Sequence, residues 1–269
     1  MWRENYHTHT TFSDGAHTVE EMVQAAIALG MPIIGFSDHS KNEWSMDYCM
    51  QDEEGYRRAV LAAKEKFAQR IAVLCGIEQE WFSGKASGYD YVIGSVHLLK
   101  TPDGYKDVDH TAAIQKETAD TFFDGDFYAY TKAYFETVAT LHETVDPTVI
   151  GHFDLVAKFN EQARFFDETD KRYITPAIEA IHALCEKKDT VFEINTGALP
   201  RGARRMPYPA PMFLKEIKAA GGKILFSSDS HKAETLLFGG DVMAETAKAA
   251  GFNSRVIIKP DGSLTEIEI

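Results

Sequence analysis

Imidazole and carboxylate side chains gather within a few residues of one another near the start of the chain. The segment YHTHTTFSDG (residues 6–15) contains His7, His9 and Asp14. Residues two apart on an extended segment point to the same side, so both imidazoles can reach one ligand, and the following loop can return Asp14 over them. Because imidazole and carboxylate groups together suit zinc, iron or manganese, this segment is predicted to supply part of a metal site.

Groups of the same kind follow further short apolar segments of the sequence. Six of the ten histidines lie at such positions, and the other four lie in loop or helix segments, where solvated or capping roles suffice. A single histidine beside a strand is usually hydrogen-bonded structure, but coincidence explains the joint pattern poorly. The groups that follow the apolar segments are His7 and His9, Asp38 and His39, Glu78, His97, His152, Asn195, and Asp229 with His231. The four remaining histidines are His17, His110, His142 and His182.

The apolar segments that precede these groups are rich in β-branched residues and alternate with longer segments of helical period. Near-continuous apolar strands separated by helices are typical of a parallel sheet whose outer face is covered. We therefore expect a closed or nearly closed α/β barrel, in which the carboxyl ends of all strands converge on one face and place the active site there. Strands are predicted to end near Tyr6 and to span 32–37, 71–77, 91–96, 148–151, 190–195 and 223–228.

The first helix has a clear start and end in the sequence. Thr18 and Glu21 are spaced as a capping box, in which the two side chains satisfy free amide groups at the start of a helix. Gly30 is expected to end the helix. The apolar stripe predicted to face the sheet consists of Val19, Met22, Val23, Ala26 and Ile27.

Length and composition bound the class of protein. The 269 residues are 44% hydrophobic and 26% charged, which is typical of a globular protein. The sequence shows no Pro/Gly/Ser-rich linker, low-complexity tract or internal repeat that would mark a boundary, so one domain over 1–269 is expected. The three cysteines form no CxxC pair and are odd in number, which argues against a disulfide framework and against a thiolate zinc site.

Charge and hydropathy exclude several classes of partner. The net charge of −13 disfavours long nucleic acid and anionic lipid, which are bound through clustered Lys and Arg, and favours a small-molecule substrate. No apolar segment approaches the roughly 20 residues that span a bilayer, and residues 1–10 have neither the basic start nor the apolar stretch of a signal peptide. No membrane association and a cytoplasmic location are therefore expected.

The motifs resemble those of the polymerase and histidinol phosphatase (PHP) superfamily. Those that resemble its four motifs are HTH (7–9) with Asp14, SDH (37–39), GSVH (94–97) and SSDSH (227–231), and those that resemble its intermediate ligand sites are GIE (76–78) and GHFD (151–154). The resemblance implies a distorted (β/α)7 barrel, similar to a TIM barrel, with a trinuclear metal centre at the C-terminal face of the strands. Within the superfamily, GHFDLVAKF (151–159) and EINTGAL (193–199) are most similar to stand-alone histidinol-phosphate phosphatases.

The resemblance implies two or three divalent transition metals, zinc, iron or manganese, as cofactors. A carboxylate shared by two metals would hold them roughly 3.5–4 Å apart, the spacing at which a bridging water is acidified to hydroxide. Glu78 is preferred as this ligand, although Glu80 lies on the same side of the extended segment. Asp38 fits either a carboxylate that orients an imidazole or a turn cap. The implied ligand sets are His7, His9, Glu78 and Asp229 for the first metal, Glu78, His97 and His152 for the second, and Asp14, His39 and His231 for the third.

The implied activity is hydrolysis of L-histidinol phosphate to L-histidinol and phosphate, a step of histidine biosynthesis. Hydroxide between the first two metals would attack phosphorus while the metals and an arginine neutralise the equatorial oxygens. Asp229 or a protonated group near His39 would assist the leaving alkoxide. Related phosphatases read close to NTSGLRK where this chain has NTGALPRGARR (195–205), so the choice among its arginines stays open. The candidates for substrate binding are Arg201, ranked first, Arg204, Arg205, Lys158 and Asn195.

Two other functions are compatible with the sequence. Related barrels process nucleotide 3′ ends, so a phosphodiesterase or exonuclease acting on short nucleotides, or a phosphatase for another small phosphate ester, is the first alternative. The missing basic track argues only against long nucleic acid. A non-catalytic binding module is the second alternative, and the complete ligand set argues against it because a decayed site would lack some members. The sequence leaves the oligomeric state open.

Overall fold

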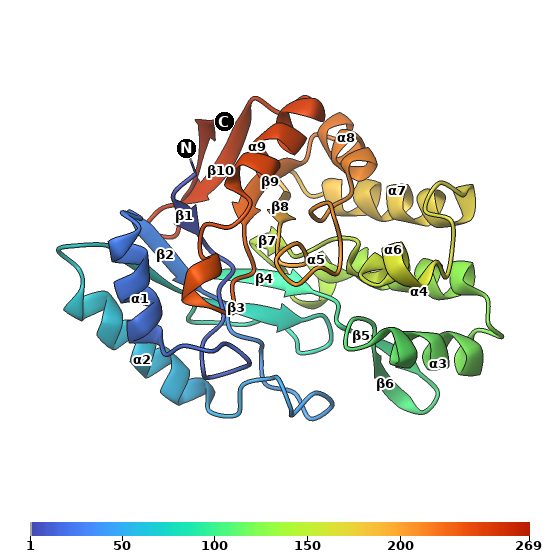
Figure 1. Ribbon diagram of the computed structural model, residues 1–269, viewed down its shortest axis with the longest axis horizontal. Coiled ribbons are helices and arrows are strands. Elements are labelled where there is room, and N and C mark those ends of the chain that lie inside the picture. Colours follow the sequence, from blue (N-terminus) through green and yellow to red (C-terminus); the bar gives the residue numbers. More distant parts are fainter. Residues whose placement is uncertain (1) are drawn as a thin grey trace.

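The computed structural model describes residues 2–269, and parallel strands form the centre of the molecule (Figure 1). Within this range, seven strands form one sheet in the order β1, β2, β3, β4, β7, β8, β9, and neighbouring strands are parallel. These are the seven strands predicted from the sequence. Their bounds are β1 Glu4–Asn5, β2 Ile33–Phe36, β3 Ala72–Glu80, β4 Tyr91–Ser95, β7 Val149–Ile150, β8 Val191–Asn195 and β9 Lys223–Ser227.

The two edges of the sheet meet just beyond the carboxyl ends of β1 and β9. A parallel bridge joins Thr8 and Ser230, with the His9 amide donating to the Ser230 carbonyl at 2.9 Å and the Ser230 amide donating to the His7 carbonyl at 3.0 Å. We call this junction of residues 7–9 with residues 229–231 the barrel seam. It closes the sheet, and the distorted (β/α)7 barrel expected from the motifs is confirmed.

A C-terminal hairpin packs beside the two edge strands of the sheet. Strands β10 (Ser254–Ile258) and β11 (Leu264–Glu268) pair antiparallel, β10 lies next to β9, and the Tyr6 hydroxyl donates to the Ile258 carbonyl at 3.0 Å. Figure 1 shows both chain termini beside this hairpin. The hairpin was not predicted, because the half-exposed alternation of β11 gives a weak signal.

Apolar side chains from several strands meet inside the barrel. Tyr6, Leu74, Tyr91, Val149 and Leu225 come from the region of five different strands and are buried against one another. Inward-facing side chains that fill the space between strands make such a barrel a packed core rather than a pore. The functional groups must therefore lie at an end of the barrel.

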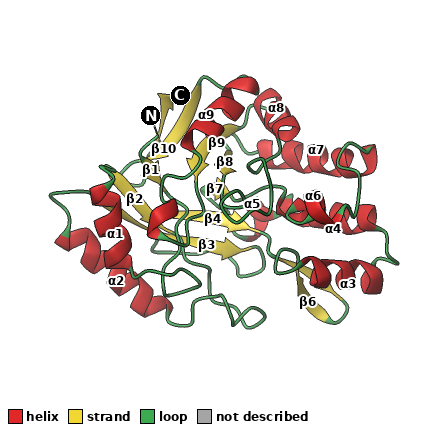
Figure 2. Ribbon diagram, in the orientation of Figure 1, coloured by secondary structure: helices red, strands yellow, loops and turns green. Residues whose placement is uncertain are grey.

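Helices cover the outer face of the sheet, and Figure 2 shows them around the central strands. In Figure 1, α1 and α2 lie on one side of the barrel, and α4 and α7 on the other. The α-helices of residues 2–269 are α1 Val19–Ala28, α2 Glu53–Lys66, α3 Ala112–Phe122, α4 Phe127–Val138, α5 Leu141–Thr144, α6 Asn160–Ala163, α7 Lys171–Cys185, α8 Pro211–Ala219 and α9 Gly240–Ala249, with 3-10 turns at η1 Leu155–Ala157 and η2 Ala233–Thr235.

Helix α1 follows the sequence prediction closely. The Thr18 side chain accepts from the Glu21 amide and the Glu21 carboxylate accepts from the Thr18 amide, which is the expected capping box. The predicted stripe is buried, except that Ile27 is half-buried. Gly30 follows the helix with φ of +70°, a left-handed conformation that favours glycine.

A second hairpin directly follows β4 and was also not predicted. Strands β5 (Leu98–Thr101) and β6 (Gly104–Asp107) pair antiparallel, and residues 108–110 follow them. Because this hairpin starts at the carboxyl end of β4, it lies at the end of the barrel where parallel strands present functional groups.

The described residues also bear on the cysteines and on membrane-spanning helices. Cys49, Cys75 and Cys185 are free thiols, and the first two are buried. Across residues 2–269, no helix combines the length and apolarity that crossing a membrane requires.

Candidate metal centre

Glu78 lies at the centre of a group of imidazoles at the carboxyl ends of the strands. Its Oε2 atom is 2.9 Å from His39 Nδ1 and 3.2 Å from His7 Nε2. Its Oε1 atom is 2.9 Å from His152 Nε2 and 3.3 Å from His97 Nε2. One carboxylate thus contacts side chains that follow four different strands, as the convergence of strand ends in a parallel barrel requires.

A second group of side chains surrounds Asp14. Its Oδ2 atom is 3.1 Å from His231 Nε2, and its Oδ1 atom is 3.6 Å from His9 Nδ1 and 3.8 Å from His39 Nε2. Asp229 joins the two groups, because its Oδ1 atom lies 3.3 Å from His9 Nε2 in the second group and 3.8 Å from His7 Nε2 in the first. The two groups therefore form one continuous cluster.

Unpaired atoms inside the cluster fit a metal ion. His7 Nε2, His9 Nε2 and Glu78 Oε2 are buried close to one another, yet none of them makes a hydrogen bond of good geometry in the described chain, although buried polar atoms are nearly always satisfied. Imidazole nitrogen and carboxylate oxygen are donors for divalent transition metals, and no thiolate joins them. The residues present therefore fit the metals that the sequence implied.

The donor atoms can be grouped in several ways, so the division into three ligand sets stays a prediction. Because Glu78 is shared by so many imidazoles, several groupings bring donor atoms within 4.8 Å of one another, and His9 joins the set predicted for the third metal. The groups are His9, Asp14, His39 and His231; His7, His152 and Asp229; His7, His9 and Glu78; and His39, Glu78 and His97. All nine predicted ligands thus lie in one cluster, with the assignment to individual metals left open.

Two buried carboxylates hold imidazoles of the cluster from behind. Glu193 Oε2 is 2.8 Å from His7 Nδ1, and Glu80 Oε2 is 2.9 Å from His97 Nδ1. A partner on the far nitrogen sets the tautomer and orientation of a metal-binding imidazole. These contacts favour Glu78 rather than Glu80 as the shared ligand. Sequence reasoning missed Glu193, whose signal was a carboxylate within the apolar strand TVFEIN.

Asp38 fixes a turn and contacts no imidazole directly. Its Oδ1 atom accepts from the Thr10 amide at 2.8 Å and from the Ser13 amide and hydroxyl at 3.1 and 2.7 Å. Of the two roles that the sequence left open for Asp38, this is the turn-capping one. The contacts hold the loop that returns Asp14 over His9.

The surroundings of His7 and His9 change their pKa values in opposite directions. Burial and the neighbouring His231 lower the pKa of His9 to about 3, so its imidazole is neutral and available as a ligand. Burial also acts to lower the pKa of His7, but Glu193 and Glu78 outweigh it and raise that pKa well above its ordinary value. A divalent cation would be attracted by the same carboxylates in place of the proton.

Asp229 has a backbone conformation that is uncommon for a residue with a side chain. Its φ is +49°, in the left-handed region that non-glycine residues seldom adopt. Such local strain persists where the surrounding structure holds it, frequently at functional sites. Here the adjacent Ser230 is fixed by the barrel seam, which directs the Asp229 carboxylate toward His9.

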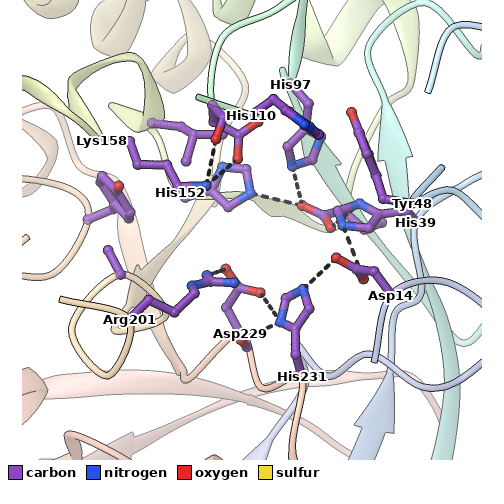
Figure 3. A pocket seen from close by; sticks show the side chains of 15 residues that line it. Asp14, His39, Tyr48, His97, His110, His152, Lys158, Arg201, Asp229 and His231 are labelled. Carbon is purple, nitrogen blue, oxygen red and sulfur yellow. Dashed lines mark hydrogen bonds and ion pairs between the residues drawn. The ribbon is translucent and has the colours of Figure 1, made fainter. Parts of the chain in front are cut away.

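The cluster forms the floor of a cavity of about 230 Å³ (Figure 3). Loop residues form its rim, so the cavity combines metal-binding groups with side chains that could contact an organic molecule. The residues that line it are Asp14, His39, Tyr48, Glu78, His97, Asp109, His110, His152, Leu155, Lys158, Ala198, Arg201, Tyr208, Asp229 and His231.

Two of the predicted substrate-binding residues lie on the cavity wall. Arg201 Nη2 is 3.2 Å from Asp229 Oδ2, and the Arg201 side chain is 42% exposed. The Lys158 ammonium donates to Asp109 Oδ2 at 2.8 Å. Figure 3 shows Arg201 and Lys158 on the side of the cavity opposite Asp14. Both cations thus face the metal-binding floor.

The other three predicted substrate-binding residues lie elsewhere, which differs from the prediction. Arg204 is buried and donates to the Ala157 carbonyl at 2.7 Å and to Glu168 at 3.0 Å, so its guanidinium is already bound. The Arg205 side chain is 93% exposed. Asn195 is buried, with its amide donating to Glu193 and its oxygen accepting from the Gly197 amide. Loop conformation, which the sequence did not reveal, separates these residues from Arg201.

The histidines expected to have solvated or capping roles follow that expectation with one exception. His17 Nδ1 accepts from the Ala233 amide at 3.3 Å, His142 pairs with Thr190 at 2.9 Å, and His182 is exposed on α7. His110, in contrast, lines the cavity. The unpredicted β5–β6 hairpin brings it there.

Comparison with a family model places this geometry in a known group. The model of the PHP domain matches residues 5–197, which contain seven of the nine clustered ligands. The chain belongs to the PHP domain family. This confirms the family inferred from the motifs, while Asp229 and His231 lie beyond the matched residues.

Two curated relatives of this PHP protein carry the name "Probable histidinol-phosphatase". The one from Schizosaccharomyces pombe is 23% identical over 277 residues, covering 93% of this chain and 87% of the relative. The one from Deinococcus radiodurans is 26% identical over 242 residues, covering 84% of this chain and 85% of the relative.

Solved structures share the fold of this PHP protein. A histidinol phosphate phosphatase from Lactococcus lactis subsp. lactis, in complex with zinc, L-histidinol and phosphate, has a TM-score of 0.71 and 23% identity over 97% of this chain and 98% of its own. A second structure, of a protein from Listeria monocytogenes that also carries the name histidinol phosphatase, has a TM-score of 0.74 and 22% identity. The match covers 88% of this chain and 98% of the other.

Proposed function

We propose that this PHP protein is a hydrolase, a metal-dependent phosphomonoesterase that acts on L-histidinol phosphate. The observation that carries the proposal is the cavity itself: seven of the nine clustered metal-binding side chains line its floor, His7 and His9 are fully buried in the same cluster, and Arg201 and Lys158 line the wall. A phosphate monoester needs both components, since its charge is neutralised by cations on more than one side during transfer. The names of the relatives and the ligands of the Lactococcus lactis structure support the choice of ester.

The cluster is proposed to hold two or three zinc, iron or manganese ions through the nine predicted ligands. When bound, such ions polarise phosphate oxygens and make a water molecule nucleophilic at neutral pH. Glu193 orients the His7 imidazole, and Glu80 orients the His97 imidazole, toward the proposed metal site. The buried carboxylates thus give the floor a fixed geometry before substrate enters.

Arg201 is proposed to bind the phosphate group of the substrate. Its guanidinium lies beside Asp229 at the edge of the floor, 42% exposed and therefore accessible. A guanidinium contacts two phosphate oxygens at once, and this geometry stabilises charge as it spreads over them. His39 and Asp229 both line the cavity and are proposed to assist the departure of the alkoxide.

The organic half of the ester is proposed to contact the loop residues at the rim. Tyr48 and Tyr208 offer aromatic surface, and Asp109 offers a carboxylate. A cavity of about 230 Å³ suits a small molecule and is below the common range for larger ligands. These features favour a small amine ester over an oligonucleotide.

Steady-state assays of the metal-reconstituted protein test the proposal. L-histidinol phosphate, simple sugar phosphates and a chromogenic phosphodiester should be compared by kcat/KM. We expect L-histidinol phosphate to be the best of them. A higher kcat/KM for the phosphodiester would replace the proposal by the nucleotide-processing alternative, and no turnover of any ester by metal-loaded protein would support the binding module.

A further inference from the structure

Lys158 and Asp109 form an ion pair within the wall of the cavity. The ammonium lies 2.8 Å from the Asp109 carboxylate and also donates to the Asp109 carbonyl at 2.7 Å. Both residues line the cavity, and their side chains are only 18% and 20% exposed. Each charge is therefore largely neutralised by the other before any substrate binds.

The surroundings of this pair are acidic. Burial raises the pKa of Asp107, and the neighbouring Asp109 raises it further. The Tyr48 hydroxyl donates to Asp107 Oδ1 at 3.3 Å. Burial acts to raise the pKa of Asp109 as well, but Lys158 outweighs it and lowers that pKa to about 2. Asp109 therefore stays ionised, and Lys158 is the cation that compensates it.

An anionic ligand and the Asp109 carboxylate compete for the Lys158 ammonium. If the ammonium turns to a phosphate, Asp109 remains as a charge in a poorly solvated wall, and leaving such a charge without a partner is unfavourable. A ligand that brings its own cation removes this penalty. An ammonium close to the phosphate would take the place of Lys158 at Asp109, so that one ion pair is exchanged for two.

We propose that the Lys158–Asp109 pair selects zwitterionic phosphate esters, with Lys158 turning to the phosphate and Asp109 binding the ammonium of a 1,2-amino alcohol. This inference rests on the proposed function and names its substrate class. It assigns Asp109 and Lys158 as specificity-determining residues. The Lys158 ammonium and the Asp109 carboxylate lie 2.8 Å apart. In an ester of a 1,2-amino alcohol the ammonium lies beside the phosphate, so it can contact Asp109 while the phosphate contacts Lys158.

Binding measurements give the sharpest test, because each substitution should raise the affinity for one ligand and lower the affinity for the other. Calorimetric titration of the metal-loaded protein with inorganic phosphate and with L-histidinol avoids any need for turnover. Asp109→Asn frees Lys158 and should tighten phosphate binding about 10-fold while weakening L-histidinol by a similar factor. Lys158→Met frees Asp109 and should do the reverse. The absence of either gain overturns the proposal.

A matched pair of esters tests the same idea in turnover. L-histidinol phosphate and 3-(imidazol-4-yl)propyl phosphate differ only in the amine. The unsubstituted protein should prefer the amine ester by about 10-fold or more in kcat/KM, and Asp109→Asn should reduce this preference to about 2-fold. If Asp109→Asn lowers both esters equally, Asp109 has a structural role and the proposal fails.

Two exposed residues provide control variants. Asp103→Asn changes a carboxylate at the turn of the same β5–β6 hairpin, and Lys171→Met removes an exposed lysine at the start of α7. Both should leave the two affinities and the ester preference unchanged, with metal content and Tm measured for every variant. A protein that turns over neither ester contradicts the proposed function, whereas the binding titrations still decide the role of the ion pair.

Discussion

The floor and the rim of the cavity are built in different ways. Floor residues stand at or just beyond the ends of parallel strands, are mostly buried, and include imidazoles held from behind, as His7 is by Glu193. Rim residues such as Arg201 and Lys158 stand on loops and are bound to single carboxylates at the cavity wall. Strand register therefore positions the reactive groups, while loop conformation decides which molecule reaches them. Substitutions in the two regions should accordingly fail in different ways.

The largest effects are expected from floor residues at the barrel seam. His9→Ala or Asp229→Ala removes a donor from the centre of the cluster and should abolish most metal binding and lower kcat/KM by at least about 1,000-fold. Elemental analysis and steady-state assays measure the two losses. His182→Ala, on the exposed face of α7, should leave both nearly intact. Equal losses in all three variants would mean that floor and surface residues do not differ in their contribution to metal binding and activity.

Metal content of the unsubstituted protein tests the floor directly. We expect two or three transition metal ions per chain after reconstitution, and a strong chelator should remove them together with activity. Less than one ion per chain with full activity would contradict the clustered metal site.

The next largest effect is expected at the rim. Arg201→Ala should cost about 2–4 kcal/mol of transition-state stabilisation, seen mainly in kcat/KM, with metal content unchanged. Arg201→Lys should restore only part, because an ammonium cannot contact two oxygens in the same plane. If alanine variants of Arg201, Arg204 and Arg205 all stay within a few-fold of the unsubstituted protein, this loop does not bind phosphate and Lys158 alone is left as the proposed phosphate-binding cation of the rim.

A smaller effect is expected from the carboxylate behind the floor. Glu193→Gln keeps the shape of the side chain but weakens its contact with His7, and should lower metal affinity by about 10–100-fold. Competition with a chelator measures this affinity. Glu186→Gln, on the exposed C-terminal end of α7, is the matched control. Unchanged affinity in Glu193→Gln would show that strand geometry alone orients the imidazole.

The smallest effect on activity is expected for Arg205→Met, because this side chain is 93% exposed.

Arg204→Met separates stability from catalysis in the same loop. It removes a buried cation from the Ala157 carbonyl and from Glu168, and the free energy of unfolding should fall by about 3 kcal/mol. Thermal unfolding measures both variants. An equal Tm for the two would show that burial of Arg204 adds no stability.

The same division explains what the sequence could predict. The strands and floor residues were found because apolar periodicity is a local signal and because each functional group follows its strand directly, as His97 follows β4. The rim was found only in part. Arg201 and Arg204 stand three positions apart in one loop, and no local pattern shows that one faces the cavity and the other faces Glu168. His110 was misjudged since the hairpin that carries it was not predicted.

Glu193 illustrates a signal that was present but not used. A carboxylate in the middle of an apolar strand is costly to bury unless it has partners. In the structure it accepts from the His152 amide and the Ser227 hydroxyl in addition to its contact with His7. Because burying such a residue is costly, its presence in an apolar strand predicts a hydrogen-bond partner on a neighbouring strand.

The barrel seam has a consequence for how the protein is made. It joins two segments that lie far apart in the chain, as the contact of Asn5 with Ser228 across 223 residues shows. His7 and His9 leave the ribosome before Asp229 and His231, because most of the barrel lies between them in the chain. A nascent chain cannot assemble the full set of ligands until Asp229 and His231 have been made, because the seam cannot close without them. The complete set of metals is therefore captured only after Asp229 and His231 have been made, and a chain terminated before them lacks two of the nine ligands.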